Sequence, residues 1–214
     1  MPDLKLVVLD CDGVMFDSRE ANRAYYGHLR QRFGRPALTE EEVAFVHAHP
    51  APESVPHIFG AWPQDLAAVN AYRATLDYAP FLRQMAIEPD LTEFLAAIRP
   101  PLATAISTNR TSTMPAVLDA FALRPHFDLV VTALDVARPK PHPEALLKIL
   151  AHFGVAAREG IFVGDSQVDA EHAAAVGMPL VAFRSPGLAA AWHVSSFREL
   201  LRLPPFARRS GRRP

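Results

Sequence analysis

Two aspartates separated by one residue follow an apolar run near the start of the chain. Residues 7–18 read VVLDCDGVMFDS, in which Asp10 and Asp12 precede Gly13. A short apolar run that ends in glycine is typical of a buried strand, and open α/β sheets bind ligands at the carboxyl ends of their strands. Two neighbouring carboxylates repel each other unless a divalent cation neutralises them or one holds a proton. The pair indicates metal or acid/base chemistry, although acids also fill turns and cap helices.

A hydroxyl-rich segment follows a second apolar run. Residues 103–110 read ATAISTNR, so Thr108 and Asn109 come at the end of a strand-like stretch. Hydroxyl and backbone N–H groups at a strand end can hold a phosphoryl oxygen. The same residue types also form ordinary helix N-caps, so this segment alone leaves both interpretations open.

A lysine lies between two prolines in residues 137–144, which read ARPKPHPE. Pro139 and Pro141 exclude regular helix and keep the chain extended, which restrains the position of Lys140. A lysine in a solvated loop needs no such restraint. We therefore interpret Lys140 as a cation held at a fixed position.

A second pair of acids ends a further apolar run. Residues 161–169 read IFVGDSQVD, in which Asp165 follows Gly164 and Asp169 comes four residues later. If a helix begins near Ser166, both acids lie at its N-terminal end and face the same opening. The segment therefore adds two carboxylates to the predicted site.

The elements that must carry these residues alternate between strand and helix. The strand-like runs lie near residues 4–9, 102–107, 127–133, 160–164 and 179–183. Segments with helical spacing separate them, over residues 113–121, 143–153 and 168–176. This pattern predicts an α/β fold with a Rossmann-like, doubly wound parallel sheet.

The block over residues 19–88 has a different composition. It lacks β-branched runs and is rich in Ala, Glu, Arg, Leu and aromatic residues, so it predicts an inserted all-helical cap domain. The catalytic core would then comprise residues 1–18 and 89–203. Residues 204–214 combine arginines with Pro, Ser and Gly, a composition typical of a disordered basic tail.

The four segments occur in the order acid pair, hydroxyl, lysine, acid pair, a combination more specific than any one member. From residue 7 to residue 169 the chain resembles the haloacid dehalogenase-like (HAD) superfamily of hydrolases, whose motifs would be DCDGVMFDS, STN, the lysine in RPKPHP, and GDSQVD. The insertion between the first two motifs resembles the helical cap of the phosphoglycolate phosphatase and β-phosphoglucomutase group. The resemblance implies chemistry on phosphoryl groups.

The resemblance and the chemistry of the residue types imply the same catalytic roles. Asp10 would attack phosphorus as the nucleophile and form an aspartyl-phosphate. Asp12 would act as general acid and then as general base, which requires that its surroundings raise its pKa. Thr108 would hydrogen-bond a phosphoryl oxygen, and Lys140 would offset the negative charge of the phosphoryl group.

The implied cofactor is Mg²⁺, which prefers a few carboxylates together with substrate oxygen and water. The predicted metal ligands are Asp10, Asp12 through its main-chain carbonyl, Asp165 and Asp169. For Asp169 two roles stay open, because it could bind the metal through water or orient Lys140.

Substrate selectivity is expected to depend on the cap, because a closed cap excludes water and selects the leaving group. Gly13, which leaves room for the backbone to turn, and Asn109 are predicted to bind substrate. The cap candidates are the polar residues Arg23, His47, His49, His57 and Arg73. For each of them, a position on a solvated helix face is the competing interpretation.

Composition agrees with a compact enzyme. The chain has 214 residues, of which 50% are hydrophobic, and a formal net charge of −1. The small charge gives no reason to expect nucleic acid or a membrane as partner. Cys11 is the only cysteine, so an internal disulfide is excluded and a cytoplasmic location is expected. The first residues show no signal-peptide pattern.

The expected function is that of a Mg²⁺-dependent phosphatase acting on a small phosphorylated metabolite, such as phosphoglycolate or a sugar phosphate. A phosphomutase of the β-phosphoglucomutase type would share all four motifs and return the phosphoryl group to a sugar. A catalytically silent binding protein on the same fold is a third possibility. A haloacid dehalogenase proper needs no second acid two residues after the first, so Asp12 argues against it. The sequence leaves the oligomeric state open.

Overall fold

A parallel sheet of six strands forms the centre of the computed structural model, which describes residues 3–207. Its strands are ordered β5-β4-β1-β6-β7-β8, and every neighbouring pair is parallel. Their bounds are β1 Leu6–Leu9, β4 Ala103–Ser107, β5 Leu129–Val131, β6 Gly160–Gly164, β7 Leu180–Phe183 and β8 Trp192–Val194. The predicted Rossmann-like, doubly wound parallel sheet is confirmed. The short strand β8 was not predicted, because its residues form no apolar run.

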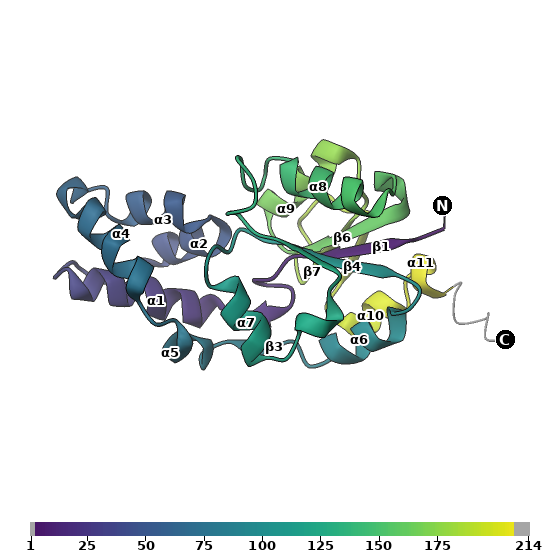
Figure 1. Ribbon diagram of the computed structural model, residues 1–214, viewed down its shortest axis with the longest axis horizontal. Helices are drawn as coiled ribbons and strands as arrows, with labels where there is room; N and C mark the ends of the chain where they lie inside the picture. The colour runs from purple at the N-terminus through teal and green to yellow at the C-terminus, as the bar shows by residue number, and fades with distance from the viewer. Residues whose placement is uncertain (1–2, 208–214) are drawn as a thin grey trace.

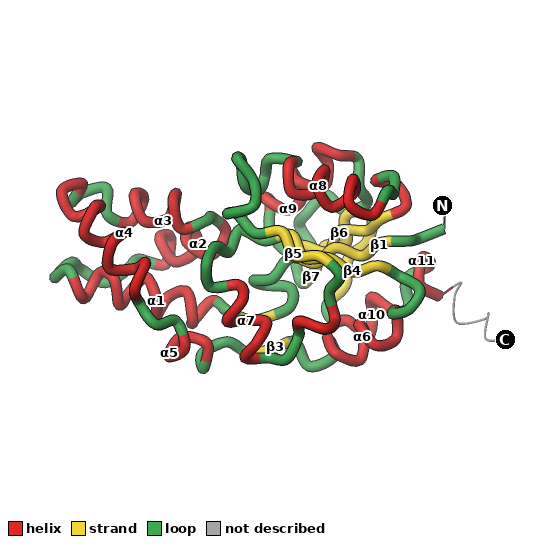
Figure 2. The backbone as a smooth tube through the Cα atoms, in the orientation of Figure 1, coloured by secondary structure: helices red, strands yellow, loops and turns green. Residues whose placement is uncertain are grey.

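Helices cover both faces of the sheet, as Figure 1 and Figure 2 show. Along β1, Leu6 and Val8 pack in the cluster that includes Leu146 of α8, whereas Val7 and Leu9 pack in the other core cluster. This alternation follows from the two-residue period of a strand, and it explains why β1 is apolar on both faces. The helices around the sheet are α6 Leu91–Ile98, α7 Met114–Ala120, α8 Glu144–Phe153, α9 Gln167–Val176 and α10 Phe197–Leu201.

A block of five helices is inserted between β2 and β3. These two-residue strands, Phe16–Asp17 and Ala86–Ile87, pair with each other in antiparallel fashion and bring the ends of the insertion together. The inserted helices are α1 Arg19–Arg32, α2 Glu40–Ala48, α3 Ala51–Ile58, α4 Leu66–Thr75 and α5 Ala79–Leu82. Figure 1 shows that β1 runs from the N-terminus toward this block, so the carboxyl ends of the parallel strands face the inserted helices.

Short 3₁₀ turns and local caps complete the chain. The turns lie at Pro63–Asp65, Arg124–His126 and Ala157–Glu159. Helix α2 begins at a capping box, in which the Thr39 side chain accepts from the Glu42 backbone N–H and Glu42 accepts from Thr39 N. None of the described helices is both long and apolar enough to cross a membrane.

The last described helix, α11, spans Pro204–Ala207. Phe206 is buried and its ring contacts Phe94. The prediction of a disordered tail is therefore wrong for residues 204–207, because burial of one aromatic ring fixes a segment whose composition is typical of a tail. The rest of the predicted tail, residues 208–214, lies outside the described residues.

Candidate active site

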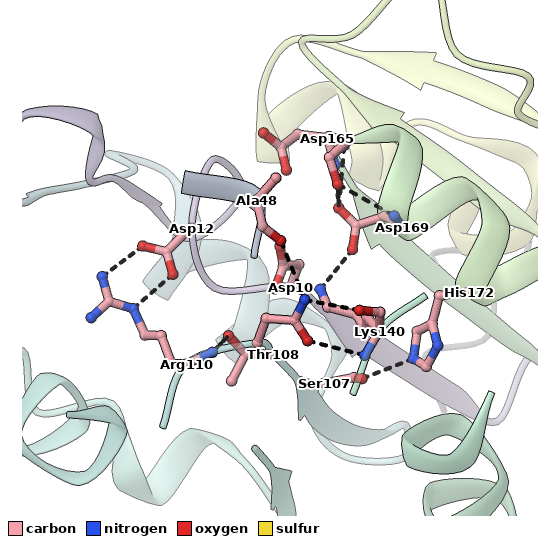
Figure 3. Close-up of polar contacts among 12 residues, drawn as sticks. Asp10, Asp12, Ala48, Ser107, Thr108, Arg110, Lys140, Asp165, Asp169 and His172 are labelled. Carbon is pink, nitrogen blue, oxygen red and sulfur yellow. Dashed lines mark hydrogen bonds and ion pairs between the residues drawn. The ribbon is translucent and has the colours of Figure 1, made fainter. Parts of the chain in front are cut away.

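Three of the predicted motifs meet because their strands are neighbours. β1 lies between β4 and β6, so Asp10 comes directly after the central strand, Thr108 after β4 and Asp165 after β6. The three residues line one cavity of about 280 Å³, and the inserted helices form its opposite wall. Figure 3 shows these side chains together with Lys140 and Asp169. The sheet order therefore explains how residues up to 155 positions apart reach one site.

Lys140 is buried between two carboxylates. Its Nζ lies 2.8 Å from Asp10 Oδ1 and 2.6 Å from Asp169 Oδ1. Burial alone would lower the pKa of Lys140, but the attraction of Asp10 and Asp169 outweighs burial and raises the pKa above its usual value. The structure thus places a permanent positive charge against the oxygen of Asp10.

The amide of Asn109 holds the backbone of Lys140 from both sides. Asn109 Oδ1 accepts from Lys140 N at 3.0 Å, and Asn109 Nδ2 donates to Lys140 O at 3.1 Å. The same Nδ2 donates to Ala48 O at the end of α2, at 3.2 Å. Asn109 was predicted to bind substrate, but its amide is occupied by backbone groups. Its observed contacts fix Lys140 and join the core to the inserted helices.

Asp169 is fully buried, and both of its oxygens have protein partners. Oδ1 accepts from Lys140 Nζ, while Oδ2 accepts from Asp165 N and Ser166 N at 3.2 Å and from Ser166 Oγ at 2.7 Å. These contacts also cap α9, because Ser166 Oγ accepts in turn from Asp169 N. Of the two roles left open by the sequence, the geometry favours the orientation of Lys140.

The carboxylate cluster has the composition of a site for a hard divalent cation. Single oxygens of Asp10, Asp165 and Asp169 all lie within 4.8 Å of one another. Burial is the main cause that raises the pKa of Asp10 to about 7 and that of Asp165 to about 8, with further contributions from neighbouring carboxylates. The raised pKa values show that these carboxyl groups do not readily ionise together without a neighbouring cation. A cluster that offers only carboxylate oxygens suits Mg²⁺. Because the oxygens of Asp169 are occupied, Asp10 and Asp165 are the better ligands.

Asp12 is held by an arginine that the sequence analysis did not assign to the site. Arg110 Nε donates to Asp12 Oδ2 at 2.8 Å and Arg110 Nη2 to Asp12 Oδ1 at 2.6 Å, and Ser18 Oγ also donates to Oδ1. Burial would raise the pKa of Asp12, but the guanidinium outweighs burial and lowers the pKa below its usual value. The prediction of a raised pKa for Asp12 is therefore wrong in this arrangement.

A buried histidine, also missed from the sequence, connects the elements around Lys140. His172 Nδ1 donates to His142 O at 2.8 Å, which leaves Nε2 to accept from Ser107 Oγ at 3.0 Å. Burial lowers the pKa of His172 to about 4, so the ring is neutral near pH 7. One imidazole thus joins α9, the end of β4 and the loop that carries Lys140.

The inserted helices bring three of the five predicted cap candidates to the cavity: His47, His49 and Arg73. Arg23 instead pairs with Glu40 at 2.7 Å on the exposed surface, and His57 is exposed and stacks on Phe45. The other polar residues on this wall were not predicted; they are Asn22, Tyr25, Tyr26 and Tyr78. Asn22 Nδ2 lies 2.9 Å from His47 Nδ1, so this ring is oriented toward the cavity by a neighbour.

Gly13 makes room for the carboxylate of Asp165. Its φ is +78°, and a Cβ built there would lie 2.0 Å from Asp165 Oδ2. The structure thus shows Gly13 packed closely against a candidate metal ligand, and contact of Gly13 with substrate stays a prediction.

Replacement of Gly13 by alanine should displace Asp165 and lower activity and the affinity for divalent cation by about tenfold or more, the effect of disturbing a metal ligand. Gly154→Ala and Gly177→Ala are matched controls, because both glycines have positive φ and open space where a Cβ would lie. All three variants share the backbone strain of about 1 kcal/mol. Cation titration of thermal unfolding would measure the difference. Equal cation affinity in all three variants would show that Gly13 does not serve Asp165.

Comparison with known proteins agrees with the motifs. The family model described as haloacid dehalogenase-like hydrolase matches residues 7–183. Phosphoglycolate phosphatase of Escherichia coli (strain K12) is 34% identical over 95 residues. That match spans 44% of this chain and only 38% of the relative.

Solved structures extend the likeness over the whole fold. A HAD-superfamily hydrolase, subfamily IA, from Geobacter sulfurreducens PCA shares 39% identity, with a TM-score of 0.80 over 93% of this chain and 98% of that one. β-Phosphoglucomutase from Clostridium difficile has a TM-score of 0.80 at 16% identity, covering 98% of this chain and 100% of its own, and so shares the fold. The family resemblance of the motifs is confirmed. This chain belongs to the haloacid dehalogenase-like hydrolase family.

Proposed function

We propose that this protein is a Mg²⁺-dependent phosphatase that hydrolyses a small phosphomonoester through an aspartyl-phosphate on Asp10. The observation that carries the proposal is the position of Asp10 in the cavity, with the ammonium of Lys140 at 2.8 Å and Asp165 beside it. A carboxylate so placed can attack phosphorus while a fixed cation offsets the charge of the phosphoryl oxygens.

Thr108 supplies a hydrogen bond to the phosphoryl group in this proposal. Its Oγ1 accepts from Arg110 N at 3.1 Å, which leaves the hydroxyl hydrogen available as a donor. Thr108 is buried and lines the cavity. A donor and a cation therefore line the same cavity as Asp10.

The reaction takes two displacements at phosphorus. In the first, a carboxylate oxygen of Asp10 forms a bond to phosphorus, the bond to the leaving oxygen breaks, and Asp12 gives that oxygen a proton. In the second, water attacks phosphorus and gives a proton to Asp12, and the bond between phosphorus and Asp10 breaks. Asp12 can carry the proton in both steps only after it leaves the guanidinium of Arg110.

Asp10 and Asp165, with the main-chain carbonyl of Asp12, would hold the Mg²⁺. When bound, Mg²⁺ supplies positive charge that neutralises the phosphoryl oxygens and orients them for in-line attack. Asp169 acts on this centre through Lys140, whose ammonium it holds.

The inserted helices act as a cap in this proposal, with residues 19–88 as the cap and residues 1–18 and 89–203 as the core. Ala48 of α2 contacts Asn109 of the core, so the cap lies over the catalytic groups. A cavity of about 280 Å³ can hold a small phosphomonoester. Phosphoglycolate, the compound in the name of the Escherichia coli relative, is small enough for this cavity. Short sugar phosphates are also small enough.

The test is phosphate release from a panel of small phosphorylated metabolites, with Mg²⁺ and with a chelator. We expect release from at least one member of the panel, loss of that activity with chelator, and its return when Mg²⁺ is restored. Phosphate release that is unchanged by the chelator would contradict the assignment of a metal site. Conversion of a sugar 1-phosphate into the 6-phosphate without release would instead show a mutase, and silence across the panel would contradict a catalytic function for these substrates.

A further inference from the structure

Arg110 is a buried residue whose side chain lines the cavity. Besides its two bonds to Asp12, its Nη1 donates to Tyr78 Oη at 3.2 Å and to Thr113 Oγ1 at 3.4 Å. Its side chain is only 6% exposed. Figure 3 shows the planar fork of Arg110 facing the carboxylate of Asp12, on the far side of Thr108 from Lys140. The fork–fork geometry is the one that guanidinium groups adopt with carboxylates.

This pairing conflicts with proton transfer by Asp12. Arg110 holds both carboxylate oxygens of Asp12, and Ser18 holds one of them as well. For either oxygen to reach a leaving group, the bidentate contact must break. A buried guanidinium left without its partner is strongly unfavourable, so another anion has to take the place of Asp12.

The cavity is suited to a substrate that carries this anion. The part of its wall that residues 19–88 form contains Arg73 and no carboxylate. Arg110 also follows Thr108 by two residues, and its backbone N–H bonds the Thr108 hydroxyl, so the guanidinium belongs to the same loop as the phosphoryl donor. A planar carboxylate fits the fork, because Asp12 occupies it.

We propose that Arg110 selects substrates in which a carboxylate lies close to the phosphoryl group, and that this carboxylate replaces Asp12 on the guanidinium and so frees Asp12 for proton transfer. The inference rests on the proposed phosphatase function and specifies its substrate class as small phosphorylated carboxylic acids. Arg110 then determines specificity by direct contact with the substrate carboxylate. It also positions Asp12, because it holds Asp12 until the substrate carboxylate replaces it.

The experiment compares phosphoglycolate with its carboxamide, which has the same size and lacks the negative charge on the acyl group. For the native protein we expect kcat on the carboxylate to exceed kcat on the amide by about 100-fold, the order expected for the loss of a hydrogen bond between charged groups. The difference should persist at saturating substrate, because release of Asp12 follows binding. In Arg110→Ala this ratio of kcat values should fall to near one.

Two further variants make the result specific. Arg110→Lys keeps the charge without the planar fork and should give an intermediate ratio. Arg124→Ala is the matched control, because Arg124 pairs with Asp119 on the exposed surface; its ratio should equal that of the native protein. Arg110→Lys also serves if Arg110→Ala does not fold.

Three outcomes would overturn the inference. The ratio of kcat on the carboxylate to kcat on the amide could be near one in the native protein, or it could be unchanged in both Arg110 variants. The third outcome is a difference between the two compounds in KM alone. These are distinct from failure of the phosphatase proposal, in which the native protein releases no phosphate from either compound or from the wider panel.

Discussion

Replacing Asp10 by asparagine should lower phosphate release by about 10⁴-fold or more, because the variant lacks the oxygen nucleophile and cannot form the aspartyl-phosphate. The change preserves the size of the side chain and one oxygen toward Lys140. Release of inorganic phosphate from the best substrate of the panel, with saturating Mg²⁺, is the direct measurement. Asp119→Asn on the exposed surface is the matched control and should retain native activity.

Above neutral pH, Asp10→Asn should be at least as stable as the native protein. Burial raises the pKa of Asp10 to about 7, so between about pH 4 and pH 7 the folded state holds a proton that the unfolded state has lost. The contribution of Asp10 to stability is therefore full below its unfolded pKa and is lost as pH rises through about 7. The asparagine side chain of the variant does not titrate. The melting temperature of Asp10→Asn relative to native should rise between about pH 4 and pH 8 in the absence of divalent cation.

Residual activity decides between interpretations of Asp10. If Asp10→Asn folds and still releases phosphate at about a tenth of the native rate or faster, water attacks phosphorus directly and no covalent intermediate forms on Asp10. A variant with no activity and an unchanged melting profile at every pH would support the nucleophile but contradict the unfavourable burial of its charge.

The central part of the site could be predicted because it follows from strand ends. Asp10, Thr108 and Asp165 each end an apolar run, and the carboxyl ends of adjacent parallel strands meet at one edge of a sheet. Their meeting needs only that β1 lie between β4 and β6. The two prolines beside Lys140 predicted that its position is restrained, whereas its place at the site was implied by the family resemblance. Local signals were sufficient where the fold brings the ends of strands together.

The partners of these residues could not be predicted, because they depend on side-chain packing between distant segments. Asp12 and Arg110 are 98 positions apart, and no pattern in either segment says that one carboxylate will meet that guanidinium. An arginine directly after the STN motif was a visible signal, but it fitted a solvated loop equally well. The pKa of Asp12 was predicted in the wrong direction for this reason.

Which residues of the inserted helices face the cavity could not be predicted either. Composition indicated helices over residues 19–88, but which polar residues face the cavity depends on how each helix is rotated against the core. His47 and Arg73 reach the cavity, whereas Arg23 binds Glu40 at the surface. Helix periodicity cannot separate these cases when two faces of a helix are both partly polar.

Replacing Lys140 by methionine should reduce both turnover and stability. The variant leaves Asp10 and Asp169 buried without the cation that lies 2.8 Å and 2.6 Å from their oxygens. Loss of one partner from a buried ion pair typically costs about 3–5 kcal/mol of folding free energy. Loss of a charge that stabilises the transition state should lower kcat by about 10³-fold. Urea unfolding and phosphate release measure the two effects, and Lys148→Met, on the exposed face of α8, is the matched control.

The double variant Lys140→Met with Asp169→Asn separates the two effects. Asp169 has its second oxygen on Asp165 N, Ser166 N and Ser166 Oγ, contacts that asparagine can keep in part through its carbonyl oxygen. Removal of the uncompensated charge should therefore restore most of the lost stability, since a buried charge without a partner is the main penalty in the single variant. Turnover should stay low, because the cation beside Asp10 is still absent. If the double variant regains activity together with stability, Lys140 serves only to neutralise Asp169 and has no role at the phosphoryl group.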